Sequence, residues 1–351
     1  MSLVATLVQD FRGRAPEYDK FEFRITEAGT YNAFFTQDMS GSSWMTPDLK
    51  QTVLASTPAN TVSVPVINYK DVTIRSTRPL TISADENTSA LDTITFTTLA
   101  YGFHMYPAQH YNNEIDYAKD FDRKFKAMLV KMASTLEGLA VTAIDAAKTQ
   151  VVGEVVGGHT FASNVVSETG IANLQSSYIL SDLDPMMRSN DYMPFMMDVV
   201  GNQGLNAILQ RMEGFGEMNQ ENKTLQFMSK RFGFSNSISN AVGKDATGYA
   251  IADGTLGMLT RVEPDSVFRT RLPDGHEWDT VVLPGLGIEV GTYSYISAVD
   301  ASSVAGAATA HLTRTSMQAF DFAFDIAFVP AYNSDLTTIP APILKFDVAT
   351  A

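Results

Sequence analysis

The chain has 351 residues, of which 45% are hydrophobic and 18% are charged, and this excludes a disordered chain. Its length suits one large domain or two interleaved domains. The net charge of −14 argues against a protein that binds nucleic acid by neutralising phosphates. The absence of cysteine excludes disulfides, cysteine-ligated metal sites and a thiol nucleophile. We find no signal-peptide pattern and no membrane-spanning stretch, and therefore expect a soluble protein.

Residues 1–60 are expected to be extended and irregular. Glycine or proline recurs every dozen residues or so, which leaves intervals too short and too unpatterned for a helix. The stretch nevertheless carries many aromatic residues, which disordered tails avoid. These are Phe11, Tyr18, Phe21, Phe23, Tyr31, Phe34, Phe35 and Trp44. We expect them to lie on a surface, either of this subunit or of a neighbour.

Residues 61–100 have the pattern of a long β-hairpin. Residues 61–67 and 92–99 alternate β-branched or apolar residues with polar ones, as half-buried strands do. Pro65 restricts the first of them to an edge strand or a bulge. The polar stretch between them, residues 68–91, predicts a wide tip. Because such a hairpin buries little core of its own, we expect it to rest on another part of the structure.

Residues 114–148 predict the clearest element, a long amphipathic helix. Apolar residues recur there at spacings of three and four. Asn113 is the expected N-cap, with Asp116 three residues later. At about 1.5 Å per residue the helix would be about 50 Å long, which is more than a globular helix usually reaches.

The remainder of the chain predicts a mixed domain followed by a strand. Residues 163–310 combine short helices, near 173–188 and 204–212, with short β segments separated by glycine, proline and aspartate. Residues 311–330 then alternate strictly. Phe320, Phe322, Phe324, Ile326 and Phe328 fall on one face, with Asp321, Ala323, Asp325 and Ala327 on the other. The last segment, 331–351, is expected to be extended.

No catalytic or metal-binding pattern emerges. The histidines at 104, 110, 159, 276 and 311 form no spaced ligand set. Residues 274–279 gather three carboxylates and one histidine, but Asp-Gly before a strand predicts a turn. The glycine-rich spots at 254–257 and 285–287 match no nucleotide-binding motif and are interpreted as turns.

Charged side chains give no site either. Asp321 and Asp325 would be about 13 Å apart on one strand, too far for a glycosidase pair, so we expect a solvated or interface face. Three basic clusters are flanked by acids and are interpreted as solvated faces or salt bridges between subunits rather than phosphate contacts. They are Arg75 with Arg78, Lys223 with Lys230 and Arg231, and Arg261 with Arg269 and Arg271.

The order of these parts resembles the tailed-bacteriophage major capsid protein of the HK97 type. Residues 92–107, DTITFTTLAYGFHMYP, are similar to the strand that leads into the family's long spine helix. Residues 114–148, with the small-residue run 138–147, are similar to that helix, and residues 311–330 to the strand that returns beside it. The resemblance is one of architecture and covers nearly the whole chain.

The resemblance implies an α+β, HK97-like capsid fold with five parts. Residues 1–45 would form an N-terminal arm and residues 46–93 the hairpin called the E-loop, both lying across neighbouring subunits. Residues 94–155 would form the peripheral domain with spine helix 114–148. Residues 156–305 would form the axial domain, and residues 306–351 the return strand of the peripheral domain with the C-terminal tail.

The implied function is that of a virion structural protein and not an enzyme. The chain would self-assemble into hexamers and pentamers of an icosahedral head that encloses viral DNA without sequence-specific binding. No cofactor, metal or membrane is implied; scaffolding, portal and decoration proteins are potential partners. The location would be the virion, after assembly in the host cytoplasm.

The resemblance also suggests assembly contacts, which are Lys70, Arg75, Arg78, Phe21, Phe23 and Trp44. Some relatives crosslink a hairpin lysine to a neighbour's asparagine, and Lys70 matches that lysine by location only. In a departure from the family, no long scaffolding region precedes the arm. Three alternatives stay open: an encapsulin-like shell, another virion structural protein, and an enzyme with an unrecognised site.

Overall fold

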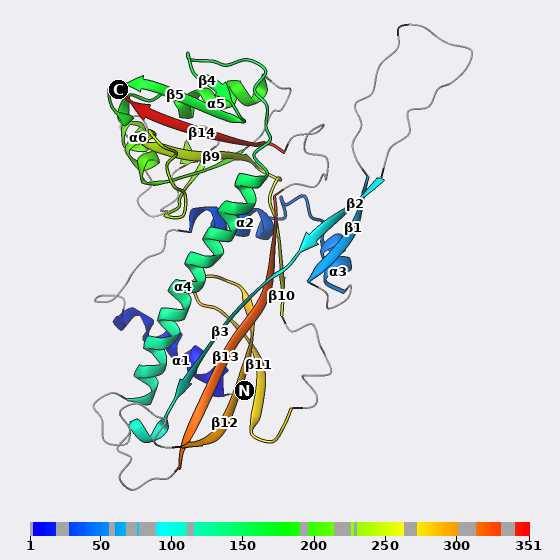
Figure 1. Ribbon diagram of the computed structural model, residues 1–351, viewed down its shortest axis with the longest axis vertical. Coiled ribbons are helices and arrows are strands. Elements are labelled where there is room, and N and C mark those ends of the chain that lie inside the picture. The colour runs from blue at the N-terminus through cyan, green and yellow to red at the C-terminus, as the bar shows by residue number, and fades with distance from the viewer. Residues whose placement is uncertain are drawn as a thin grey trace, which may run out of the picture.

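The computed structural model consists of an elongated body, a compact sheet domain at one end and a hairpin that projects from the side (Figure 1). The described residues are 3–18, 28–55, 60–67, 76, 89–110, 116–189, 196–213, 226–227, 230–262, 272–300, 314–330 and 341–351.

The body is built on a five-stranded antiparallel sheet around one long strand. That strand, β13 (Arg314–Val329), has β3 (Thr97–Met105) along one edge. Its other edge pairs first with β12 (Glu289–Asp300) and then with β10 (Gly257–Arg261). Strand β11 (His276–Val282) completes the sheet beside β12. The alternation of residues 311–330 therefore predicted β13 correctly.

Helix α4 (Tyr117–Ala146) lies along this sheet and confirms the predicted spine helix. Its residues Phe121 and Phe125 are fully buried. Phe125 lies 5.5 Å from Phe322 of β13 and Phe121 lies 5.6 Å from Phe103 of β3, measured between ring centroids. Asp116 is the N-cap, whereas Asn113 lies outside the described residues. The helix is long and apolar enough to cross a membrane by length and composition, but this stripe packs on the sheet as in a core helix.

The compact domain contains a seven-stranded mixed sheet with its own hydrophobic core. The strands, in spatial order, are β4 (Thr160–Ala162), β5 (Val165–Ile171), β14 (Ile343–Thr350), β9 (Ala246–Ala252), β6 (Met197–Gly201), β8 (Lys230–Phe234) and β7 (Gln226–Phe227). Helices α5 (Ile179–Arg188) and α6 (Gln203–Glu213) accompany it. Two single-turn 3₁₀ helices, η1 (Pro107–Gln109) and η2 (Leu174–Ser176), complete the described elements.

The two sheets do not coincide with the predicted domain boundaries. Strands β10, β11 and β12 fall within 156–305, yet they belong to the sheet of the body. Strand β14, placed in the return segment 306–351, lies in the middle of the other sheet, between β5 and β9. The expectation failed because a strand's own pattern shows that one face is buried, but not which partner strands bury it.

The expectation of an irregular N-terminal arm was wrong. The structure has three helices there, α1 (Leu3–Tyr18), α2 (Gly29–Met39) and α3 (Pro47–Ala55). Two of the supposed breaks are helix starts, because Gly29 and Pro47 are the first residues of α2 and α3, and the fixed φ of proline suits that position. Two of the aromatic residues find their surface within the subunit: Phe11 lies 5.1 Å from Phe125, and Phe34 lies 4.8 Å from Phe328. Phe21 and Phe23 lie outside the described residues.

Helix α2 is held on the spine by one buried carboxylate. Glu137 of α4 accepts hydrogen bonds from the backbone N–H groups of Thr30, at 3.0 Å, and Tyr31, at 2.8 Å. These are free donors of the first turn of α2, where negative charge is favourable. Tyr31 also donates its hydroxyl to the carbonyl of Leu286, at 2.6 Å, and burial raises the pKa of this hydroxyl, which keeps it protonated.

Replacement of this carboxylate is expected to destabilise the subunit. Glu137→Ala leaves two buried backbone donors without a partner and should reduce the free energy of unfolding by about 2–3 kcal/mol. Glu137→Gln keeps one acceptor and should cost about half as much. Denaturant unfolding followed by circular dichroism would measure both. Glu154→Ala, at an exposed position, serves as the control; equal stabilities for all three variants would contradict the capping role.

Candidate assembly surfaces and the junction between the sheets

The two strands of the hairpin lead away from the body of the subunit (Figure 1). Its strands β1 (Thr61–Ile67) and β2 (Ser89–Thr95) are antiparallel, and Ile67 pairs with Ser89 at the outer end. This confirms a hairpin with its first strand at 61–67. The second strand is β2 and not the predicted 92–99, which spans the end of β2 and the start of β3. Its base packs on the subunit through a cluster of buried side chains. The cluster comprises Met45, Val53, Val62, Val64, Ile94, Phe96, Leu259 and Ala327.

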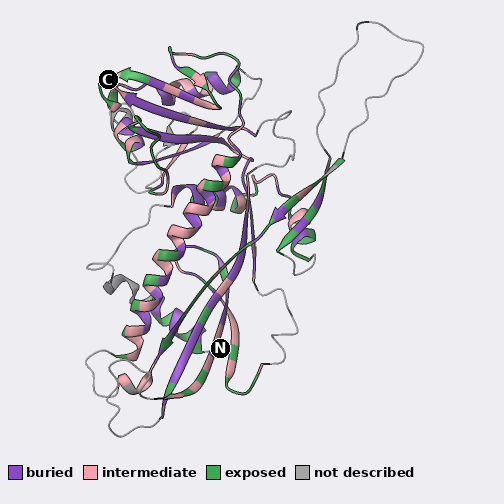
Figure 2. Ribbon diagram, in the orientation of Figure 1, coloured by how far each residue is buried: buried purple, intermediate pink, exposed green. Residues whose placement is uncertain are grey.

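One face of the hairpin is left uncovered (Figure 2). Ser63 and Pro65 on β1, together with Leu91 and Thr93 on β2, are exposed, and they alternate with the buried Val62, Val64 and Ile94. Leu91 is 70% exposed, which is unusual for a large aliphatic side chain in a strand. This face and the residues beyond it form the candidate assembly surface of the hairpin.

Among the predicted contact residues, the structure describes only Trp44. Its indole Nε1 donates to the carbonyl of Val329 at the end of β13, at 3.1 Å, and its ring packs against the hairpin-base cluster. Trp44 therefore holds the hairpin to its own subunit. Phe21, Phe23, Lys70, Arg75 and Arg78 lie outside the described residues, and their role in assembly stays a prediction.

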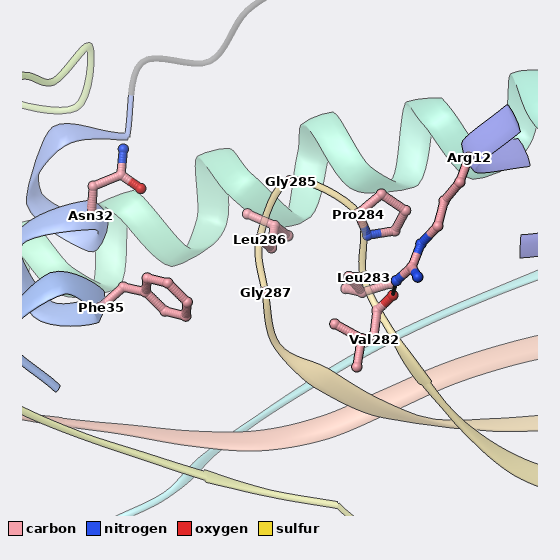
Figure 3. A pocket seen from close by; sticks show the side chains of 9 residues that line it. All are labelled: Arg12, Asn32, Phe35, Val282, Leu283, Pro284, Gly285, Leu286 and Gly287. Carbon is pink, nitrogen blue, oxygen red and sulfur yellow. Dashed lines mark hydrogen bonds between the residues drawn. The ribbon is translucent and has the colours of Figure 1, made fainter. Parts of the chain in front are cut away.

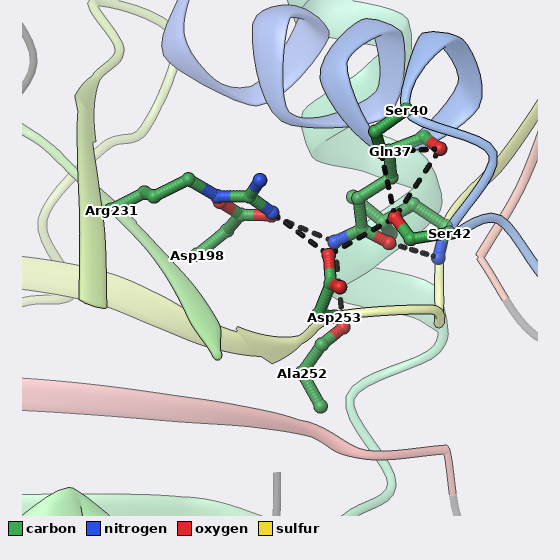
Figure 4. A network of polar contacts seen from close by, with 8 residues as sticks. Gln37, Ser40, Ser42, Asp198, Arg231, Ala252 and Asp253 are labelled. Atoms are coloured by element: carbon green, nitrogen blue, oxygen red, sulfur yellow. Dashed lines mark hydrogen bonds and ion pairs between the residues drawn. The ribbon is translucent and has the colours of Figure 1, made fainter. Parts of the chain in front are cut away.

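A polar network occupies the point where the two sheets are joined (Figure 4). Gln37 of α2 is fully buried, and its amide nitrogen donates to Asp198 of β6 at 2.7 Å. Its amide oxygen accepts from the backbone N–H of Leu256 at 2.9 Å. Arg231 of β8 donates two hydrogen bonds to Asp198, at 2.6 and 2.8 Å, and a third to Asp253, at 2.9 Å. Sequence reasoning missed Gln37 because an uncharged side chain in a stretch expected to be irregular carries no pattern.

The electrostatics of the network reflect its burial. Burial raises the pKa of Asp198 above its usual value, although the hydrogen bonds and charge of Arg231 act in the opposite direction. Asp253 adds to the rise because it is a second negative charge close by. The paired geometry shows what Arg231 does: it holds two carboxylates from different segments, which would otherwise repel each other.

A pocket of about 500 Å³ lies between α1, α2 and the turn that connects β11 to β12 (Figure 3). Its wall includes Phe35 of α2 and the residues of the turn, 282–287. Arg12 of α1 closes one end by donating to the carbonyl of Val282 at 2.6 Å. The lining has no acid and no histidine, so the pocket lacks the groups that acid–base catalysis needs.

The comparisons with known proteins rest on structure alone. Neither a protein-family model nor a curated protein sequence matches the chain. Among solved structures, a chain from Mycobacterium phage Che8 aligns with a TM-score of 0.51 and 9% identity, covering 93% of each chain. The capsid structure of the cyanophage P-SCSP1u gives a TM-score of 0.46 and 12% identity, over 94% of this chain and 90% of that one. The bacteriophage PhiM1 mature capsid gives 0.46 and 11%, over 84% and 82%.

The alignment with the Che8 chain extends over nearly the full length of both chains. The chain has an HK97-like α+β fold. At 9% identity, the similarity to the Che8 chain lies in the fold and not in the sequence.

The described members of the basic clusters, Lys230, Arg231 and Arg261, form ion pairs within the chain. Arg75, Arg78, Lys223, Arg269 and Arg271 lie outside the described residues. Arg261 was expected on a solvated face or in a salt bridge between subunits, but it pairs with Asp325 inside the chain at 2.8 Å and both are buried. The guanidinium also lies 4.4 Å from the centre of the Phe96 ring at the hairpin base. Lys230 is buried and pairs with Asp184 at 3.2 Å. The expectation failed because the alternation of a strand shows which residues share a face of the sheet. It does not show that the hairpin base covers the face that carries Arg261 and Asp325.

The carboxylates and histidines of the HK97-like chain form no metal site among the described residues. His104, His110 and His276 lie apart on β3, at the end of η1 and at the start of β11; His311 lies outside the described residues. His159 is buried and lies 2.9 Å from Asp182. Gly275 has a φ of +81°, which confirms the predicted Asp-Gly turn; it lies at 274–275, and β11 begins directly after it at His276. Gly254, Gly285 and Gly287 also have positive φ values, as turn glycines do.

Acid is expected to weaken the contact between the spine helix and the seven-stranded sheet. Asp145, near the end of α4, accepts hydrogen bonds from Tyr249 of β9, at 2.6 Å, and from Lys345 of β14, at 3.1 Å, and it pairs with Lys148 at 2.6 Å. Partial burial raises the pKa of Asp145, but these three partners outweigh it and lower the pKa to about 2. The stabilisation is therefore fully present above about pH 4 and is lost as the pH falls through about 2.

The expected effect is modest because the Asp145 side chain is 41% exposed. We expect no more than about 1 kcal/mol between pH 4 and pH 2. Unfolding of the wild type and Asp145→Asn, measured at half-unit pH steps, should show a smaller loss for the variant across that interval. Asp321→Asn, at an exposed position on β13, is the control. Parallel pH profiles for the wild type and Asp145→Asn would show that the three partners do not stabilise the charge.

Proposed function

We propose that this chain is a major capsid protein that self-assembles into hexamers and pentamers of an icosahedral head enclosing viral DNA. The observation that carries the proposal is the HK97-like fold, which extends over 93% of the chain. Solved chains of similar topology come from structures described as phage capsids. The function is structural, and the virion is its location, after assembly in the host cytoplasm.

The shape of the subunit supports assembly. The hairpin extends away from the body and leaves one face with the exposed Leu91 uncovered (Figures 1 and 2). A two-stranded hairpin is marginally stable alone, so its outer part gains from contact with another surface. In a shell each subunit repeats the same contacts, and many weak contacts give a stable assembly without disulfides.

The charge of the chain supports a container for DNA rather than a DNA-binding protein. The net charge of −14 disfavours tight binding to phosphates, which suits a lumen that must take up and release a genome. Scaffolding, portal and decoration proteins are the proposed partners. We propose no cofactor, metal or membrane.

Negative-stain electron microscopy of the purified chain, together with light-scattering mass, tests the proposal. Closed shells, rings of six or five subunits, or sheets of such rings are expected. Nucleic acid inside shells recovered from infected cells would indicate a virus head, whereas an enclosed enzyme would indicate an encapsulin-like compartment. A uniform particle of one to four subunits, unchanged when the proteins encoded beside it are co-expressed, would contradict the capsid function.

A further inference from the structure

The connection between β9 and β10 is one of the short links between the two sheets. Strand β9 of the seven-stranded sheet ends at Ala252, and β10 of the five-stranded sheet begins at Gly257. The link between these two strands therefore consists of only four residues, 253–256. A link of four residues leaves little freedom, and whatever holds it fixes how one sheet is attached to the other.

Gln37 holds this link from both sides. Its amide nitrogen contacts Asp198 of β6 and lies 3.4 Å from the carbonyl of Ala252, whereas its amide oxygen receives the N–H of Leu256 at 2.9 Å. One buried side chain thus connects the end of one sheet to the start of the other. Its loss would leave the polar groups of Asp198 and Leu256 short of partners in a buried site, where an unmade hydrogen bond is costly.

The same segment leads directly into the hairpin base. The carbonyl of Gln37 accepts from the backbone N–H of Ser43 at 3.0 Å, and the hydroxyl of Ser42 donates to Asp253 at 3.1 Å. Trp44 and Met45 then enter the cluster that holds β1 and β2. A methyl group added to Gly257 would lie 2.8 Å from the Met45 side chain, so the first residue of β10 and the hairpin base are in direct contact.

We propose that the Gln37 network couples the base of the hairpin to the connection between the two sheets. Given the proposed capsid function, on which this step rests, a neighbouring subunit that binds the hairpin also fixes how the two sheets are joined. The physical basis is a continuous chain of contacts from the hairpin strands through Met45, Ser42 and Gln37 to residues 253–256. Figure 4 shows the part of this chain around Gln37, Ser42 and Asp253. These contacts couple the two places if a change in the Gln37 network alters the stability of both the hairpin base and residues 253–256.

Amide hydrogen exchange on the full chain tests the coupling in whichever assembly state the purified protein adopts. Gln37→Leu removes the amide and keeps the apolar bulk. We expect exchange to become about tenfold faster both at residues 253–257 and in strands β1 and β2, a ratio that corresponds to ~1.4 kcal/mol. Faster exchange at 253–257 with an unchanged hairpin would overturn the proposal, as would no change at either place.

A matched control separates coupling from general loss of stability. Gln318→Leu alters another buried glutamine. Its side-chain oxygen accepts a hydrogen bond from the hydroxyl of Tyr117, at the other end of the spine helix. We expect it to leave exchange at 253–257 and in the hairpin as in the wild type; faster exchange at both places in this variant would show loosening of the whole subunit and would overturn the coupling.

A milder variant keeps the proposal testable if Gln37→Leu does not fold. Ser42→Ala removes only the hydroxyl that contacts Asp253 and should give about threefold faster exchange at both segments, and a wild-type pattern in the hairpin would overturn the proposal. Because exchange needs no assembly, its outcome is independent of the microscopy that tests the capsid function.

Discussion

Replacing residues 68–88 with a two-residue Asn-Gly turn is expected to leave the subunit folded and to prevent the formation of closed shells. Ile67 and Ser89 are paired at the outer end of the hairpin, so a tight turn can join them directly. The buried side chains at the base of β1 and β2 are retained. The free energy of unfolding should change by less than about 1 kcal/mol, because shortening a loop has a small entropic effect.

The loss of assembly should be complete, because β1 and β2 lead away from the body of the subunit and the proposed function assigns the segment between them to contacts with a neighbour. Electron microscopy and light scattering, at concentrations where the wild type forms shells, would measure it. The matched control is the same operation on the β12–β13 hairpin, where Asp300 pairs with Arg314 and residues 301–313 can be replaced by the same turn. We expect the control to assemble. Normal shells from the 68–88 variant would contradict the role of the hairpin, and its unfolding would show that the removed residues belong to the core.

Elements with a strong local pattern were predicted well. The strict alternation from Phe320 to Phe328 gave β13, and the apolar stripe through Phe121 and Phe125 gave the spine helix, because each pattern reports one buried face. The hairpin followed from the alternation in residues 61–67 and 92–99, although the second of these segments spans the end of β2 and the start of β3. The order of these elements along the chain then sufficed to suggest the HK97-like fold.

Features that depend on distant partners were not predicted. Helix α2 has little amphipathic pattern of its own; it is stabilised by Glu137, more than 100 residues away, and by contact with both sheets. Strand β14 joins a sheet that its position in the chain does not indicate. The junction network unites Gln37, Asp198 and Asp253 from three segments, and no spacing in the sequence connects them. Tertiary contacts override local preference at each of these places.

Phe125→Ala is expected to have the largest effect on the stability of the subunit. The ring is fully buried between the spine helix, α1 and the five-stranded sheet. Its centroid lies 5.1 Å from that of Phe11, 5.6 Å from that of Phe121 and 5.5 Å from that of Phe322. Removal of a buried phenyl group from such a core costs about 3–5 kcal/mol through lost burial and the cavity that remains. Because a domain is stable by only about 5–15 kcal/mol, we expect little soluble, assembled protein.

Denaturant unfolding and the yield of soluble protein would measure this effect, with Tyr178→Ala as the control. Tyr178 is 58% exposed, so the loss of a ring of similar size there should change the free energy of unfolding by less than about 0.5 kcal/mol. Phe125→Leu refines the comparison, because it keeps most of the apolar bulk and should lose less stability than alanine. If Phe125→Ala were as stable and as competent in assembly as Tyr178→Ala, α4 could not be packed on the sheet through this stripe, and its role as the spine of the subunit would have to be abandoned.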